Sequence, residues 1–391
     1  MTRDSSLRLA HEYVASRAAY ERTNQIMSSK VSIPTSGRYN AKYGEKDLHR
    51  ALTALSISNG YAESGMSDLA IEASSAKVPS GSWVRDAVER VEEGRMTVML
   101  QDALRSTLDQ VKPFGVFVMA VVAGLDKHKI PRYDPTTDRG HLTRGKHERG
   151  TTTYETYGTL QCVEAGRRAQ IACEHVGLFD ENSELVESLV TRARLERVRI
   201  SLLLLDREFF SCKVINTLKR LRQTFLMPCR MTSRVKDAIM EHARGERGMV
   251  SRYAMREGRD GESSFTLVIL PKAGRDEKTE PDPLKRFIPF ATDMPERKIL
   301  WNVHRLPKDY RQRWGIESGY VGVEKFRART TSRNHTLRLF YFYYALILYN
   351  AWLLANLMLA KKFSKLLREP MIRIAIAKAV VRSTIIDSFR G

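Results

Sequence analysis

Residues 198 to 208, which decide the fold, read Val-Arg-Ile-Ser-Leu-Leu-Leu-Leu-Asp-Arg-Glu. Leucine and isoleucine fill five of the first eight positions, so this segment predicts a strand that is covered on both faces. The strand runs directly into Asp206. The segments on either side, residues 183–194 and 211–222, have the apolar spacing of helices. Together they predict a helix–strand–helix unit of an α/β protein.

Three more strands are expected before this unit. Residues 116–122 form a near-continuous apolar run, and the chain then continues through Val-Val-Ala-Gly-Leu to Asp126. Residues 151–163 are rich in Thr, Tyr and Val, and with residues 168–176 they predict a hairpin that turns near Gly166. The order strand, strand, strand, helix, strand, helix predicts an RNase H-like mixed-sheet core, although other mixed sheets remain possible.

The remaining segments predict additions to this core. Residues 1–110 look helical, and a helix-turn-helix DNA-binding module or a plain helical bundle explains them equally well. A hairpin closed by Gly258-Arg259-Asp260-Gly261, a short strand at 287–292 and a long helix from Lys308 follow the core. The expected organisation is an N-terminal helical and possibly DNA-end-binding domain (1–110), a two-part catalytic core (111–230 and 286–345), a β-rich insertion between its parts (231–285) and a C-terminal helical region (346–391).

The charge of the chain favours a polyanionic partner. Its 391 residues include 65 Lys and Arg against 45 Asp and Glu, a formal net charge of +20. Such a field attracts nucleic acid, although a merely solvated basic surface has the same composition. The four cysteines show no CxxC spacing, so we expect neither a cysteine zinc site nor a disulfide framework, and a reducing, cytoplasmic location.

One segment is long enough to cross a bilayer. Residues 339–360 contain no charged side chain. They do contain Asn350, Asn356 and four tyrosines, and nothing else in this basic chain resembles a membrane span. We therefore expect a helix buried in the core and no membrane association.

Two aspartates follow apolar strands. If the strands that lead to Asp126 and Asp206 are parallel neighbours, both carboxylates reach the same edge of the sheet. A third acid, Glu317, lies on the expected long helix, with Tyr310 and Arg313 spaced by three and four residues along one face. Considered alone, Arg313 and Glu317 could equally be a surface ion pair.

Three clustered carboxylates repel one another unless a cation neutralises them. Their hard oxygen atoms suit Mg²⁺ or Mn²⁺. Two such ions are the usual arrangement for cutting a phosphodiester. We therefore expect Asp126, Asp206 and Glu317 to be both metal ligands and catalytic residues.

These segments resemble, in order, three motifs of the DDE transposases of archaeal and bacterial insertion sequences. The motifs are Asp126–Tyr133, Asp206–Ser211 and the segment from Tyr310 to Lys325. The third is similar to the Tyr-x2-Arg-x3-Glu-x6-Lys signature of the branch that cuts through a DNA hairpin. The resemblance covers about residues 113 to 360. It implies that Asp126, Asp206 and Glu317 hold the metals, and that Tyr310, Arg313 and a lysine hold the terminal phosphate.

The chain departs from this signature at the lysine. The position seven residues after Glu317 is Glu324, and Lys325 comes one residue late, about 100° around a regular helix. Lys325 would reach the site only on an irregular helix. Other basic residues near the motifs, Arg327, Arg329 and Lys213, are candidates for phosphate contacts. For Trp301 and Trp314 we expect core packing rather than stacking on an extruded base.

The function expected from the sequence is that of a DNA transposase. It would bind the ends of its element and a target as double-stranded DNA, acting as a homodimer, as the resemblance implies. Two alternatives remain: a catalytically inactive or domesticated DNA-binding protein, and an RNase H-like nuclease or resolvase that cuts DNA without joining it.

Overall fold

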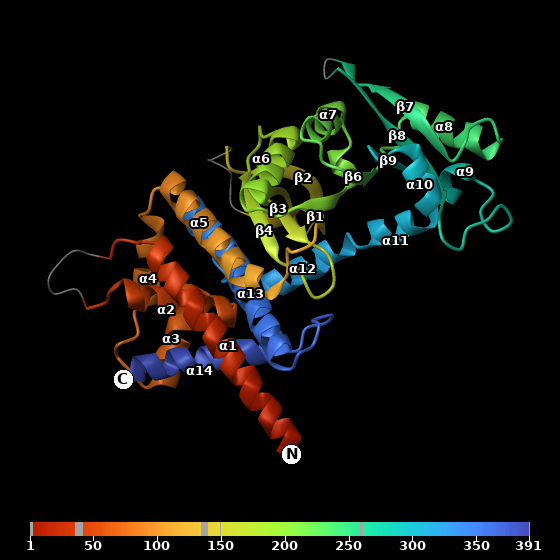
Figure 1. Cartoon of the computed structure of the whole chain (residues 1–391). Coiled ribbons are helices and arrows are strands. Elements are labelled where there is room, and N and C mark those ends of the chain that lie inside the picture. The colour runs from red at the N-terminus through yellow and green to blue at the C-terminus, as the bar shows by residue number, and fades with distance from the viewer. Residues whose placement is uncertain (1–2, 36–41, 134–139, 149, 259–260, 391) are drawn as a thin grey trace.

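A mixed β-sheet runs through the centre of the protein, as the computed structural model shows (Figure 1). The model describes residues 3–35, 42–133, 140–148, 150–258 and 261–390. Within them the sheet has nine strands in the order β2-β3-β1-β5-β6-β9-β8-β7, and β4 also pairs with β3. The strands are β1 (Val121–Arg132), β2 (Thr143–Glu148), β3 (Thr151–Cys162), β4 (Gln170–Val176), β5 (Ile200–Leu205), β6 (Phe225–Pro228), β7 (Val250–Arg256), β8 (Glu262–Pro271) and β9 (Phe287–Thr292).

The part of the sheet that contains β1, β3, β4, β5 and β6 is an RNase H-like core. β1, β5 and β6 are parallel neighbours, and β3 pairs antiparallel with both β1 and β4. Helix α6 (Asn182–Leu195) connects β4 to β5, and helix α7 (Cys212–Arg220) connects β5 to β6. Ser211 caps α7 by accepting a hydrogen bond from the Val214 N–H. This order confirms the mixed-sheet α/β fold that the sequence predicts.

The first strand differs from our expectation. The sequence predicts it at residues 116–122, but β1 begins at Val121 and continues to Arg132. The turn at Lys112–Phe114 is followed by Gly115 with φ +81°, and the side chains of Val118 and Met119 are 67% and 68% exposed. The first part of the apolar run therefore forms a turn, in which Val116 and Phe117 are buried and Val118 and Met119 are exposed. β2 was not expected, because its mostly exposed, charged sequence lacks the apolar alternation of a strand.

The β-rich insertion extends the core sheet. β7 and β8 form the expected hairpin, although residues 259 and 260 of its turn lie outside the described residues. β8 pairs with β9, and β9 pairs antiparallel with β6 of the core. The insertion also contains α8 (Ser233–Ala243) and the short α9 (Pro283–Arg286). It is therefore joined to the core through continuous backbone hydrogen bonding.

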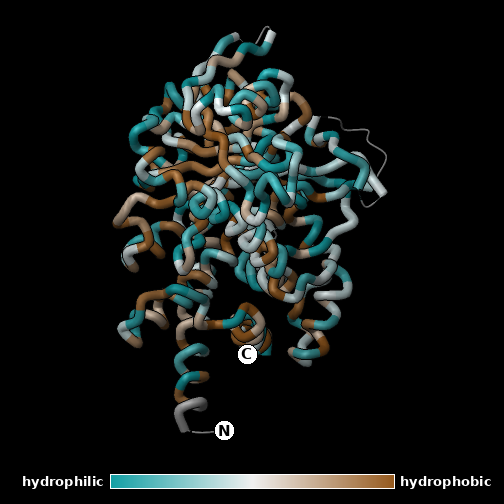
Figure 2. Tube along the Cα trace, turned by 90° about the vertical axis from the view of Figure 1, so that its right-hand side faces the viewer, coloured by the Kyte–Doolittle hydropathy of each residue, from teal (hydrophilic) through white to brown (hydrophobic). Residues whose placement is uncertain are grey.

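A bundle of helices covers one end of the core (Figure 1). A second apolar cluster fills this bundle, and Figure 2 shows hydrophilic and hydrophobic residues alternating along the helix that ends at the N-terminus. The bundle consists of α1 (Arg3–Lys30), α2 (Glu45–Ser58), α3 (Ala62–Ala73), α4 (Gly81–Glu89), α5 (Glu93–Val111), α13 (His335–Lys362) and α14 (Ile374–Arg390).

Helix α13 is the buried helix that the sequence predicts. It is long and apolar enough to cross a membrane, yet 89% of its most apolar window is buried inside the protein. Asn350 explains how a polar residue is accommodated there. Its side chain accepts a hydrogen bond from the Gln170 N–H, 2.9 Å away, and donates to the Gln170 carbonyl and the Thr107 hydroxyl. α13 also crosses the boundary that we expected between residues 345 and 346.

The long helix expected from Lys308 is interrupted. The chain instead forms α10 (Glu296–Asn302), α11 (Leu306–Arg311) and α12 (Trp314–Glu324). At the break, the Arg313 N–H donates to the Tyr310 carbonyl and the Ile316 N–H donates to the Arg313 carbonyl. These three-residue hydrogen bonds tighten the chain but keep its direction close to helical. Tyr310 and Glu317 therefore belong to two consecutive helices.

Candidate functional site

Asp126 and Asp206 lie on neighbouring parallel strands, as the sequence predicts. Leu125 of β1 pairs with Leu205 of β5, so the two aspartates occupy the next position on each strand. Asp126 lies within β1, and Asp206 directly follows the end of β5. After Leu125, β1 no longer pairs with β5 but continues to pair with β3. The aspartates therefore meet at the carboxyl edge of the parallel strands, where sites form in α/β sheets.

Helix α12 covers the face of β1 that carries Asp126. Three glycines permit this close packing. A side chain at Gly124 of β1 would overlap Ile316 of α12, and one at Gly319 would overlap the buried Gln161. A Cβ at Gly315 would lie 2.8 Å from the carbonyl oxygen of Val163. The glycines thus set the depth of α12 on the sheet.

Arg313 links the acids of the sheet to the acid of α12. Its Nη1 donates to Asp126 Oδ2 at 3.1 Å, and its Nη2 donates to Glu317 Oε1 at 3.4 Å. The Glu317 side chain is 63% exposed, whereas that of Asp126 is 16% exposed. Tyr320 also holds β1, because its hydroxyl donates to the Asp126 carbonyl oxygen at 3.1 Å. Glu317 therefore lies at the rim of the site and is joined to Asp126 through a guanidinium.

Several carboxylates lie close together in the site, and that of Asp126 is largely buried. Burial raises the pKa of Asp126 to about 6, and nearby Asp206 and Glu208 act in the same direction. The Lys127 backbone N–H and the Arg313 guanidinium oppose this shift. Burial also raises the pKa of the Tyr310 phenol to about 12, and its neighbours there are Arg313, Asp206 and Asp126. Tyr310, Arg313, Asp126 and Asp206 thus form one cluster, in which a bound cation would relieve the repulsion between carboxylates.

Lys325 does not join this cluster. α12 is helical up to Glu324, so Lys325 points away from β1 and is exposed. Its side chain lines a separate pocket with Arg168 and Ser318. The irregular helix that would bring Lys325 to the carboxylates does not occur, since the break lies before Trp314 instead.

Glu324 occupies the position expected for the lysine. It lies over β1, where its Oε1 is 2.9 Å from His128 Nε2, and it also pairs with Arg327. Burial by itself would raise its pKa, but the contacts with His128 and Arg327 outweigh burial and lower the pKa to about 2. Glu324 is thus an ionised carboxylate with partners on both sides, and it neutralises the charge of Arg327.

The other residues expected to contact DNA differ in how freely their side chains can reach a phosphate. Lys213 pairs with Glu181, with its Nζ 2.7 Å from Oε1. Arg329 is exposed, and its backbone N–H donates to the Gly60 carbonyl. The ring of Tyr310 packs against Phe290. In this structure Arg329 therefore presents its side chain to solvent, whereas Arg327 and Lys213 would have to exchange a carboxylate for a phosphate.

Two features escaped the sequence prediction. Glu208, part of the Asp206-Arg207-Glu208 motif, lies beside Lys127 and Lys129, with Nζ–Oε distances of 3.8 and 3.5 Å. Trp301 and Trp314 are 72% and 64% exposed, so the expected core packing is wrong for both. Trp314 begins α12 immediately after Arg313. An exposed indole beside the site could stack on a base.

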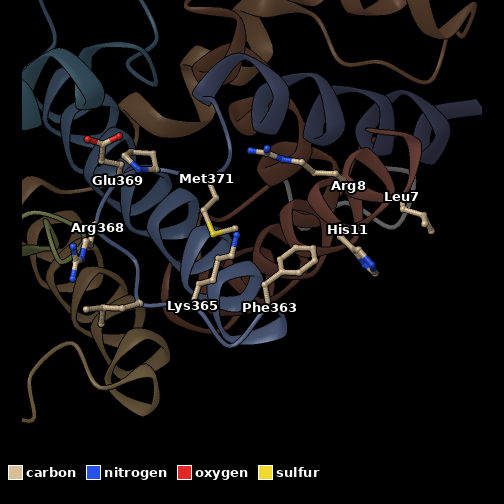
Figure 3. Close-up of a pocket in the computed structure, with 10 residues that line it drawn as sticks. Leu7, Arg8, His11, Phe363, Lys365, Arg368, Glu369 and Met371 are labelled. Atoms are coloured by element: carbon tan, nitrogen blue, oxygen red, sulfur yellow. The ribbon is translucent and has the colours of Figure 1, made fainter. Parts of the chain in front are cut away.

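The large cavity drawn in Figure 3 lies elsewhere. It has a volume of about 750 Å³ and is lined by the start of α1 and by residues 363–371. Arg8, His11 and Lys365 are among its residues, and none of the candidate acids is. The carboxylate cluster is thus separate from this cavity.

Comparison by sequence finds no similar protein, whereas comparison by structure does. No protein-family model and no curated protein matches the sequence. The cryo-EM structure of the piggyBac transposase synaptic complex with hairpin DNA matches with a TM-score of 0.54, covering 95% of this chain and 77% of that chain. The two sequences are 11% identical. The protein therefore shares its fold with piggyBac transposase.

Proposed function

We propose that this protein is the DNA transposase of an insertion sequence. The observation that carries the proposal is the position of Asp126 and Asp206, each directly after the paired residues Leu125 and Leu205 of adjacent parallel strands, beneath a helix that presents Arg313 and Glu317. The net charge of +20 and the fold of piggyBac transposase support DNA as the substrate. The hairpin DNA in that complex agrees with the hairpin-type signature that the third motif resembles.

The oxygen donors of the three acids are of the type that divalent ions prefer. Asp126, Asp206 and Glu317 offer hard oxygen donors, and Asp126 lies in a buried place where neighbouring carboxylates raise its pKa. We propose that these three residues hold two Mg²⁺ or Mn²⁺ ions. Such ions, when bound, activate the attacking oxygen and stabilise the leaving oxygen. Arg313 would then exchange its carboxylate partners for a DNA phosphate, with the Tyr310 hydroxyl beside it.

The proposed reaction has two phosphoryl transfers. In the first, water attacks a phosphodiester at the element end, and the P–O3′ bond breaks to leave a 3′-OH and a 5′-phosphate. In the second, that 3′-OH attacks another phosphodiester, across the duplex or in target DNA. A new P–O3′ bond forms as another 3′-OH leaves. Paired ends would be held by a homodimer, and the protein would act on DNA in the cytoplasm of its cell.

A strand-transfer assay tests this function. The substrate is a labelled duplex that contains the junction between the element carrying this reading frame and its flanking DNA. With Mg²⁺, we expect cleavage at the junction and joining of the freed end to a second DNA. Cleavage without joining would indicate a nuclease or resolvase. Binding without cleavage would indicate an inactive DNA-binding protein.

Replacing the two basic residues at the ends of α12, Arg313 and Lys325, should affect DNA cleavage very differently. In Lys325→Ala, we expect cleavage within about twofold of the wild type, because Lys325 faces a separate pocket. In Arg313→Ala, we expect a loss of about 10²–10³-fold, typical for removal of one group that stabilises transition-state charge. Single-turnover cleavage of the labelled junction measures both. A large loss in Lys325→Ala would show that this lysine serves the signature role after all.

Binding to DNA should weaken steeply with salt. Each phosphate that the protein neutralises contributes a slope of about −0.9 to the plot of log K against log salt concentration. Replacing the exposed Arg329 by Gln should reduce the slope by about one if this residue contacts phosphate. Fluorescence anisotropy at several salt concentrations measures it. An unchanged slope would remove Arg329 from the interface.

A further inference from the structure

Three histidines from distant parts of the sequence meet outside the carboxylate site. One ring nitrogen of each of His141, His175 and His335 lies within 4.8 Å of the others, and within the described ranges this is the one such group of potential metal ligands. His141 lies between β1 and β2, His175 is in β4, and His335 begins α13. The rings of His141 and His175 both lie against that of His335, with centroids 4.3 Å away.

Two of these histidines, His175 and His335, have a buried ring nitrogen that could bind a ligand. The His335 side chain is only 10% exposed, and its Nε2 and that of His175 have no hydrogen-bond partner. Buried polar atoms are rarely left without partners, so these two nitrogens are available to a ligand.

A buried carboxylate orients His335. His335 Nδ1 donates to Glu155 Oε1 at 2.9 Å, which directs Nε2 toward the other histidines. Glu155 is itself held by Arg132 at 3.1 Å and by the Tyr157 hydroxyl at 2.9 Å. A carboxylate behind a histidine is the usual outer partner of a metal-binding imidazole.

A fourth donor is present in Glu93, the first residue of α5. Its carboxylate oxygens lie 3.5 Å from His335 Nε2 and 3.6 Å from His141 Nε2. Three imidazoles and one carboxylate suit Zn²⁺ in tetrahedral geometry. Ligand atoms on one zinc are about 3.3 Å apart, given Zn–N bonds of about 2.0–2.1 Å. The three ring nitrogens lie within 4.8 Å of one another, so the imidazoles and the Glu93 carboxylate would have to turn toward a common point to close the site.

We propose that His141, His175, His335 and Glu93 bind one Zn²⁺ ion that fastens the helical bundle to the catalytic sheet. The four ligands come from α5 and α13 of the bundle, from β4, and from the connection between β1 and β2. The site is distinct from the carboxylates, and its role is structural. It therefore stands whether or not the protein is a transposase.

Zinc titration of the full-length protein tests this site. After removal of metal with a chelator, Zn²⁺ is added in competition with a chromophoric chelator in the presence of excess Mg²⁺. We expect one tight site per chain in the wild type. In His175→Asn and in His141→Asn, the affinity should fall by more than about 100-fold, beyond the 10–100-fold typical of outer-partner changes. Two separate variants are used in case one of them misfolds. Circular dichroism of each variant shows whether its fold is intact.

Two matched variants separate this site from others. His147→Asn changes an exposed histidine on β2, and Asp206→Asn changes a proposed Mg²⁺ ligand. Both should bind Zn²⁺ like the wild type. Chelation should lower the Tm of the wild type but not that of His175→Asn. The proposal is overturned if the wild type binds no zinc, if both histidine variants bind as tightly as the wild type, or if only Asp206→Asn loses the ion.

Discussion

An Asp206→Ala variant is expected to lose DNA cleavage by at least about 10³-fold while it binds element ends with nearly unchanged affinity. Asp206 directly follows β5 and shares the buried edge with Asp126, so it is proposed to contact the ions that the reaction needs. Losses of this size are typical when a catalytic residue is removed. Parallel cleavage and anisotropy measurements on the same junction duplex check the prediction.

The matched control is Asp237→Ala, in the exposed part of α8. It removes the same charge and should leave cleavage and binding unchanged. Mg²⁺-dependent cleavage that persists in Asp206→Ala at more than about a tenth of the wild-type rate would remove this residue from the catalytic site. Equal loss of binding and cleavage would instead indicate a folding defect.

A Gly315→Ala variant is expected to be less stable and less active. The new Cβ would lie 2.8 Å from the Val163 carbonyl oxygen, and a backbone atom of the sheet cannot move aside as a flexible side chain can. Overpacking of this kind costs about 1–3 kcal/mol. The helix that carries Glu317 would shift relative to Asp126. A misplacement of about 1 Å can reduce the rate of reaction by about 10²-fold.

Thermal unfolding and single-turnover cleavage measure the two effects. Ser318→Ala serves as control, because Ser318 lies on the exposed side of the same helix and its hydroxyl bonds only within that helix. We expect its free energy of unfolding to stay within about 0.5 kcal/mol of the wild type. A Gly315→Ala variant as stable and active as Ser318→Ala would show that α12 does not depend on close packing for its position.

The sequence predicts most of the catalytic sheet because local patterns there agree with the fold. The apolar run before Asp206 predicts a strand buried on both faces, and its parallel pairing with β1, which the sequence leaves as a condition, agrees with the helix between β4 and β5. Tyr310 and Arg313 also remain on one side of the chain, as their spacing predicts. The three-residue hydrogen bonds at the break keep a nearly helical path.

Other features depend on contacts between distant residues and have no local signal. The 116–119 segment is apolar yet forms a turn rather than a strand, so its composition misplaces the start of β1. Whether Lys325 or Glu324 faces β1 depends on where the helix breaks, and the break before Trp314 has no local signal in the sequence. His141, His175 and His335 have no motif spacing at all, and the fold alone brings them together.

The central claim is that the Asp126 and Asp206 carboxylates, with Glu317, hold a pair of divalent ions. Counting Mn²⁺ bound per chain by electron paramagnetic resonance, with a DNA end present, tests it most directly. We predict that the wild type binds two more spin-coupled Mn²⁺ ions than an Asp126→Asn, Asp206→Asn double variant. Equal Mn²⁺ binding by the two proteins would contradict the account.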